Sequence, residues 1–172
     1  MLMRTLVGAR NQLLCISTQL SNQIRGILKT FGLIVPKSKG RAFDGHVREL
    51  LSGYDDLARI VMPLLEAWRG IRMQTADLDR QLLAATRKSK ATKLLMTIPA
   101  IGAVTAISYV AAIEDPGNFK TSRSVGAWLG LTTRRYQSGE ADYDGHISRR
   151  GDNHLGGLLY EAAVVILLQE LH

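Results

Sequence analysis

The chain has 172 residues, with 22 lysines and arginines against 15 aspartates and glutamates, which gives a formal charge of +7. Because 46% of the residues are hydrophobic, there is enough apolar material for a core, and wholesale disorder is excluded. The single cysteine, Cys15, excludes an internal disulfide and a cysteine-rich zinc site, and it indicates a reducing compartment. No secretory signal layout is present at the N-terminus, so we expect a cytoplasmic location.

The positive charge is concentrated at the N-terminal end. Residues 1–43 hold seven basic side chains and no acidic one, whereas the remainder holds 15 of each and is neutral overall. Such an excess predicts a polyanionic partner, DNA or RNA, without specifying its sequence. The basic residues of this part at which we expect nucleic acid to bind are Arg25, Lys29, Lys37, Lys39 and Arg41.

Two periodic stretches predict long helices. Over residues 4–31 apolar residues recur every seven positions, and the basic, glycine-containing segment 36–45 reads as a loop. Over residues 46–86 two sets recur every seven positions: Leu50, Leu57, Leu64, Ile71 and Leu78, and, four residues later, Tyr54, Val61, Trp68, Thr75 and Leu82. This pattern is typical of a coiled coil between chains or of a bundle helix packed within one chain, and both remain open. Pro63 is expected to kink or break the helix.

The uncharged stretch 94–113 is long enough to span a bilayer, but Pro99 and Gly102 interrupt it. We therefore predict no membrane span and instead two short helices, about 90–97 and 103–113, of which Ser89 is able to cap the first. The pattern resembles a helix-hairpin-helix, in which the free amides of the second helix face a phosphate, so Gly102 is a candidate nucleic-acid contact. Ala100 stands where the usual turn has glycine, and alanine resists positive φ. A plain helical hairpin is the alternative.

The polar, glycine-punctuated segment 132–151 is where chemistry is expected. It predicts a short irregular β-hairpin, preceded by a helix that Ser122 or Ser124 caps and followed by one that Asp152 caps. Ser138 is flanked in the sequence by four arginines, whose forks match phosphate oxygens: Arg134, Arg135, Arg149 and Arg150. A serine hydroxyl beside arginines can attack a phosphodiester, although Ser-Gly is also a common turn dipeptide.

The acidic residues of the same segment alternate along the chain: Glu140, Asp142 and Asp144. In an extended strand they would share one face, where three carboxylates are able to hold Mg²⁺. Because four arginines are close in the sequence, a salt-bridged or solvated surface is favoured instead. We predict no metal site and no cofactor bound by this chain.

Several separated strings, in a fixed order, carry a family resemblance. LVGARNQLLCISTQLSNQIRGILKTFGLIVP is followed by IPAIGAVTA, DPGNFKTSRSVGAWLGLT, RRYQSG and GHISRRGDNHL. Together they resemble the C-terminal part of the IS-one-ten family of insertion-sequence transposases, the bridge-RNA-guided recombinases with a DEDD nuclease-like N-terminal domain. The resemblance covers nearly the whole chain.

The resemblance implies a site and partners. The family's serine, which attacks DNA, matches Ser138, and Ser148 is the weaker alternative. It implies DNA as partner, guide RNA as a further one, and a homo-oligomer formed through the helical region. The family's Mg²⁺ belongs to the acidic nuclease-like domain, which we expect to be missing here, so Mg²⁺ is expected only together with that domain. Leu155-Gly156 replaces the family's Leu-Arg, which removes a DNA-contacting arginine.

We therefore predict a mainly α protein. Residues 1–88 form a long helical coiled-coil or hairpin region for dimerisation. Residues 89–172 form a small helical transposase domain with a helix-hairpin-helix-like element and the short β-hairpin. The expected function is that of a truncated transposase that binds DNA and supplies a serine nucleophile. The alternative is a non-catalytic nucleic-acid-binding and dimerisation module.

Overall fold

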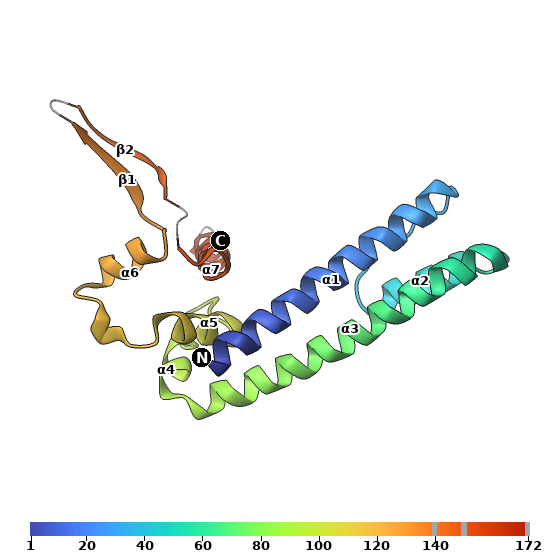
Figure 1. Cartoon of the computed structure of the whole chain (residues 1–172), viewed down its shortest axis with the longest axis horizontal. Helices are drawn as coiled ribbons and strands as arrows, with labels where there is room; N and C mark the ends of the chain where they lie inside the picture. The colour runs from blue at the N-terminus through green and yellow to red at the C-terminus, as the bar shows by residue number, and fades with distance from the viewer. Residues whose placement is uncertain (139–140, 149–150, 171–172) are drawn as a thin grey trace. The chain divides into compact units, whose positions relative to one another are not determined.

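A computed structural model of the chain describes residues 1–138, 141–148 and 151–170, without the side chains of residues 134–144 and 170. Within this part the protein is mainly α, as predicted, with one two-stranded antiparallel sheet (Figure 1). Its elements are α1 (Leu2–Thr30), α2 (Arg41–Leu50), α3 (Asp55–Lys88), α4 (Lys90–Leu95), α5 (Ala103–Ile113), the 3-10 turn η1 (Pro116–Asn118), α6 (Ser122–Trp128), β1 (Thr133–Ser138), β2 (Ala141–Ile147) and α7 (Asn153–Glu170).

The chain divides into two compact units. Gly8–Arg80 is the helical unit, and Met1–Val7 together with Gln81–His172 is the C-terminal unit. The last residues of α3 and the first residues of α1 thus belong with the C-terminal part of the chain. The functional division that we expect, between residues 88 and 89, remains a prediction.

The helical unit has one continuous hydrophobic core. Inside this unit α1 and α3 run alongside each other, and α2 packs with them (Figure 1). The side chains with at most 1% exposure in this core are Ile24, Leu28, Phe43, Val47, Val61 and Leu65. Each such burial contributes about 1.5–3 kcal/mol, so apolar contact rather than helix propensity holds the three helices together.

The predicted helix over 46–86 is wrong in two respects: it is two helices, and the first begins at Arg41, inside the segment 36–45 that was predicted to be a loop. After α2 the chain turns through residues 51–54, where Gly53 has φ 88°, and α3 begins at Asp55. Two aspartates in the first turn of α3 complement its dipole and favour a new helix start. Heptad periodicity does not detect this turn, because Tyr54 keeps the apolar spacing while its side chain is 48% exposed.

Pro63 does not break α3, contrary to the expectation. It lies inside the helix and removes the hydrogen bond that the carbonyl of Arg59 would otherwise accept. The neighbouring Val61 and Leu65 are both 0% exposed. Their burial offsets the cost of about 3 kcal/mol that proline imposes on a helix interior.

The heptad seam of α3 is used inside the chain. Val61, Trp68, Thr75 and Leu82 are all buried, with exposures of 0%, 4%, 6% and 1%. The packing alternative within one chain is therefore confirmed for these positions. The predicted homo-oligomer through the helical region is a separate question and stays a prediction.

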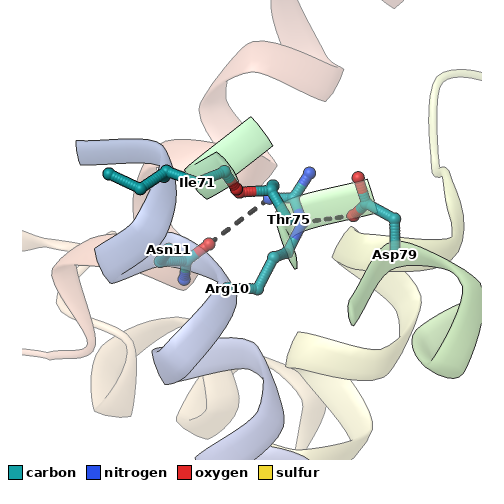
Figure 2. Close-up of polar contacts among 5 residues, drawn as sticks. All are labelled: Arg10, Asn11, Ile71, Thr75 and Asp79. Atoms are coloured by element: carbon teal, nitrogen blue, oxygen red, sulfur yellow. Dashed lines mark hydrogen bonds and ion pairs between the residues drawn. The ribbon is translucent and has the colours of Figure 1, made fainter. Parts of the chain in front are cut away.

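A polar contact joins α1 to α3 beside this seam. Arg10 donates from Nε to Asp79 Oδ1 at 2.5 Å and from Nη1 to Asn11 Oδ1 at 3.4 Å (Figure 2). Thr75 donates to the carbonyl of Ile71 at 2.8 Å, which satisfies its hydroxyl within the helix. The Arg10 side chain is only 17% exposed, so water screens this ion pair less than a pair between two fully exposed side chains.

The C-terminal unit has a small hydrophobic core of its own, formed by Val7, Leu82 and Ile107. Ser89 caps α4 as predicted, because its Oγ accepts from the Thr92 N–H at 3.3 Å. The 94–113 stretch is divided between α4 and α5. In the described part of the chain, no helix is both long and apolar enough to cross a membrane.

The turn between α4 and α5 departs from expectation at Ala100. Alanine was expected to resist positive φ, but Ala100 adopts φ 63°, so the turn takes the conformation that glycine usually provides. The left-handed region costs an alanine about 1–2 kcal/mol. The contacts of the two flanking helices hold the residue there.

We predict that Ala100→Gly stabilises the C-terminal unit by about 0.5–1 kcal/mol, since relief of the strain exceeds the entropy cost of glycine. Ala84, an exposed residue in the body of α3, is a matched control. Ala84→Gly should destabilise by about 1 kcal/mol, the usual cost of glycine in a helix interior. Urea unfolding followed by circular dichroism measures both, and equal destabilisation by the two changes would contradict the strain at Ala100.

Candidate functional site

The predicted β-hairpin is present, and its register places the candidate serine. The strands β1 and β2 are antiparallel, with Ser138 paired to Ala141 at the tip and Thr133 paired to Ile147 at the base. The register shifts near the base, so that two residues of β2 lie opposite Arg134. A bulge of this kind bends a hairpin and increases its twist.

The two candidate nucleophiles lie at opposite ends of the hairpin. Ser138 is the last residue of β1, whereas Ser148 follows β2 at the base, where its N–H donates to the carbonyl of Thr132 at 3.1 Å. Ser138 lies five residues after Thr133 along β1, which corresponds to about 17 Å at about 3.4 Å per residue. The two serines therefore belong to different places on the surface and are alternatives, not members of one catalytic centre.

The base of the hairpin is held by close backbone packing. A Cβ on Gly151 would overlap the backbone carbonyl group of Leu129, which is itself only 4% exposed. Asp152 Oδ1 then accepts from the N–H groups of His154 at 3.0 Å and Leu155 at 3.1 Å, so it caps α7 as predicted. Leu155 is 0% exposed and anchors that helix. The residues after the hairpin thus fix its base to the end of α6.

The cap of α6 differs from the prediction. Thr121, rather than Ser122 or Ser124, is the N-cap, and its Oγ1 accepts from the Ser124 N–H at 3.3 Å. Ser124 completes a reciprocal capping box by accepting from the Thr121 N–H. Both hydroxyls accept hydrogen bonds from amides at the start of the helix. The sequence prediction placed the N-cap one residue too late, because Thr and Ser are both good N-cap residues.

For the predicted arginine cluster of segment 132–151, the structure describes only the backbones of Arg134 and Arg135. Arg134 and Arg135 lie on β1, the strand that ends at Ser138. Their side chains, and that of Ser138, lie outside the described residues, as do Arg149 and Arg150 altogether. The structure therefore places only the backbones of Arg134 and Arg135 on the strand of Ser138, and the arginine cluster around that serine stays a prediction.

The helix-hairpin-helix-like element presents free backbone donors. Gly102 is the N-cap of α5, and no side chain caps the helix there. The first N–H to bond within the helix is that of Ala106, which donates to the Gly102 carbonyl at 2.9 Å. The amides of residues 103–105 have no helical acceptor, and such groups favour an anion. Gly102 remains a candidate nucleic-acid contact on this geometry.

The basic residues of the helical unit are not equivalent. Arg25, Lys37 and Lys39 line one pocket, whereas Lys29 lies in the last turn of α1 and is not among its lining residues. Arg41, the first residue of α2, lines a neighbouring pocket. The sequence interpretation missed Arg72, which also lines the first pocket and lies over the Trp68 ring at 5.1 Å. The signal that could have found Arg72 is its position four residues after Trp68, because residues at this spacing are neighbours on one face of a helix.

Mg²⁺, which the family resemblance implies for the complete protein, finds no set of ligands here. Among the described residues, no three His, Cys, Asp or Glu side chains gather closely enough to hold a metal ion.

Comparison with known proteins identifies the family of this part of the chain. Residues 92–170, which include α5, α6, the hairpin and all of α7, match the family model described as Transposase IS116/IS110/IS902 family. These residues are a transposase domain of that family. Both candidate serines, Ser138 and Ser148, lie within this domain.

Relatives extend the similarity to the helical unit. The chain is 30% identical over 164 residues to a "Probable family 20 transposase" of Pseudomonas aeruginosa, covering 92% of this chain and 48% of the relative. It is 30% identical over 168 residues to a "Putative transposase y4pF/y4sB" of Sinorhizobium fredii (95% and 43%). It is 28% identical over 168 residues to the "Transposase for insertion sequence element IS1111A" of Coxiella burnetii (95% and 46%). The chain thus spans less than half the length of these relatives.

Proposed function

We propose that the transposase domain binds DNA and supplies Ser138 as the nucleophile of strand transfer for an insertion sequence. The observation that carries the proposal is the family match over residues 92–170, which contain the hairpin and its serine. The chain spans less than half of its relatives' length, so the complete reaction is part of the proposal. Carboxylates and Mg²⁺ would come from a separate domain.

This chain would perform one chemical step, the exchange of one phosphorus–oxygen bond for another. The Ser138 oxygen forms a bond to a backbone phosphorus, the bond from that phosphorus to one flanking nucleoside oxygen breaks, and the hydroxyl proton ends on the departing oxygen. Guanidinium groups of Arg134 and Arg135, which lie on the same strand as Ser138, would stabilise the added negative charge of the transition state. The position of Ser138 at the hairpin tip supports this role, because a tip is able to enter a groove of DNA.

The decisive prediction concerns Ser138→Ala. With the acidic domain of a relative and Mg²⁺ supplied, the chain should form a covalent adduct with labelled DNA, seen as a shifted band on a denaturing gel. Ser138→Ala should abolish the adduct, a loss of about 10³-fold or more, because nothing replaces the nucleophile. Ser148→Ala should retain it, since that serine lies at the other end of the hairpin. Adduct formation by Ser138→Ala and not by Ser148→Ala would transfer the assignment to Ser148.

The second candidate function is a non-catalytic nucleic-acid-binding and dimerisation module. Residues 1–43 hold seven basic side chains and no acidic one, and this excess of charge favours the second candidate, since binding a polyanion requires no chemistry. It is distinguished by salt-dependent binding of DNA or RNA without any adduct in the same assay. Both candidate functions include guide RNA as a proposed partner.

A further inference from the structure

One pocket of the helical unit combines several features that favour an anion, and none of them belongs to the transposase domain. It has a volume of about 640 Å³, and it lies between α1, α3 and the loop that leads into α2. This volume is in the range of small-ligand sites. Four of its lining residues are basic and none is acidic: Arg25, Lys37, Lys39 and Arg72. We refer to it as the basic pocket.

The charges of the basic pocket are not neutralised by neighbouring carboxylates. In the described part of the chain, Lys37, Lys39 and Arg72 form no ion pair. Asp44, which lines the neighbouring pocket together with Arg72, forms its ion pairs with Arg48 at 3.2 Å and Arg69 at 3.8 Å. Uncompensated charge of one sign in a concave site focuses the field and attracts a counter-ion.

Arg25 and Arg72 contribute differently. Arg25 donates to the carbonyls of Val35, Pro36 and Ser38 at 3.0, 3.1 and 3.0 Å, and its guanidinium lies 4.8 Å from the Phe43 ring. Its two terminal nitrogens are thus used to hold the loop, so it supplies charge rather than donors. Arg72 is exposed and stacks on Trp68 without any protein acceptor among the described residues, so its donors are available.

The start of α2 adds backbone donors to the same place. Gly40 is its N-cap, with φ 60° and ψ −137°, and no side chain caps the helix. Arg72 reaches this point, because a Cβ placed on Gly40 would lie 3.6 Å from its Nη2. Lys39 and Arg41 flank a helix N-terminus, where positive charge is unfavourable unless an anion is bound. The free amides and the cations therefore converge on one location.

Hydroxyl groups complete the wall that α1 contributes. Ser17, Ser21 and Arg25 are spaced by four residues and line the basic pocket along one helix face. Ser17 lines the pocket although its side chain is only 7% exposed, and it makes no hydrogen bond to another described residue. An inward polar side chain without a protein partner is expected to serve a ligand or water.

We propose that the basic pocket binds a backbone phosphate of a nucleic-acid strand, with Arg72 and the α2 N-terminus as its donors. Phe43 and Trp68 are 1% and 4% exposed, so they orient the two arginines and do not stack on bases. The pocket therefore recognises the phosphodiester and not the sequence. The choice of a nucleic acid among polyanions rests on the proposed function, whereas the phosphate site itself does not depend on Ser138.

The test uses the full chain and three fluorescein-labelled probes of equal length: oligo(U), oligo(dT) and a mixed-sequence DNA duplex. Arg72→Gln should weaken binding of at least one probe by about tenfold, the loss of one charge-assisted contact. The slope of log affinity against log salt should become shallower by about 0.7–0.9, one phosphate contact. Which probe responds distinguishes RNA from DNA.

Arg59→Gln is the matched control. It lies on the same helix, removes the same charge and is 82% exposed outside the pocket, so it should change affinity less than twofold. Lys39→Gln, on the exposed loop, should reproduce the Arg72→Gln effect in the same direction without touching α3. In chains that contain 5-fluorotryptophan, adding the probe should shift the Trp68 signal of the unaltered chain. The same addition should not shift this signal in Arg72→Gln.

Two outcomes would overturn the proposal: equal losses from Arg72→Gln and Arg59→Gln, or no binding of any probe by the unaltered chain. Failure of the proposed function is recognised separately. If the probes bind through Arg72 and the Ser138→Ala variant still forms the DNA adduct, the phosphate-binding pocket stands and the assignment of Ser138 as the nucleophile is wrong.

Discussion

Gly151→Ala is expected to destabilise the C-terminal unit by about 3 kcal/mol or more. The new Cβ would overlap the backbone carbonyl group of Leu129, and backbone cannot move aside as a flexible side chain can. Overpacking costs about 1–3 kcal/mol even where side chains are able to adjust. Because the same contact holds the hairpin base against α6, we also expect Trp128, the last residue of α6, to change its environment.

Incorporation of 5-fluorotryptophan measures this change unit by unit. Trp128 reports on the C-terminal unit and Trp68 on the helical unit, so one ¹⁹F spectrum per urea concentration follows both. Gly157→Ala is the control, since a Cβ there meets nothing within 4 Å and the residue lies inside α7. It should stabilise by about 0.5–1 kcal/mol. If Gly151→Ala unfolds at the same urea concentration as the unaltered chain, the close approach to Leu129 is wrong.

Arg25→Lys should cost the helical unit about 2 kcal/mol, although the charge is kept. The guanidinium reaches three loop carbonyls at once, at 3.0, 3.1 and 3.0 Å, while it also lies over Phe43. An ammonium is a compact point charge and does not reproduce that planar fork. Each hydrogen bond from a charged donor contributes about 1.5–3 kcal/mol, so loss of part of the set accounts for the expected cost.

The Trp68 signal in urea unfolding measures this effect, since Trp68 packs on Phe43 with ring centroids 4.9 Å apart. Arg59→Lys is the matched control: its 3.6 Å pair with Asp56 is almost fully exposed, so the change should stay within about 0.5 kcal/mol. Equal effects of the two replacements would show that Arg25 does not organise the loop.

Much of the secondary structure was predictable because it depends on local signals. The periodicity of residues 4–31 predicted α1, Ser89 and Asp152 were recognised as caps, and the glycine-punctuated segment predicted the hairpin. The turn at residues 51–54 and the continuity of α3 through Pro63 were not, since both depend on which faces become buried. The Thr121 cap was missed because neighbouring hydroxyl residues satisfy the same rule equally well.

The candidate site divides in the same way. Ser138 was selected from its neighbours and from the family resemblance, and no periodicity argument could show that Ser148 lies at the opposite end of the hairpin. Arg72 was not selected, since an arginine within a heptad pattern reads as solvated surface. Only the loop that Arg25 holds brings it beside Gly40 and the start of α2.

By itself the sequence determined the mainly α class, the cationic first quarter and the family of the C-terminal domain, because composition, spacing and motif order are local properties. The tertiary structure decided how the charges are used. Of the basic residues 25, 37, 39 and 72, one is committed to the fold and three are left facing a pocket without carboxylates. That distinction depends on long-range packing of α1, α2 and α3, since a guanidinium becomes structural only when folding brings carbonyls to it.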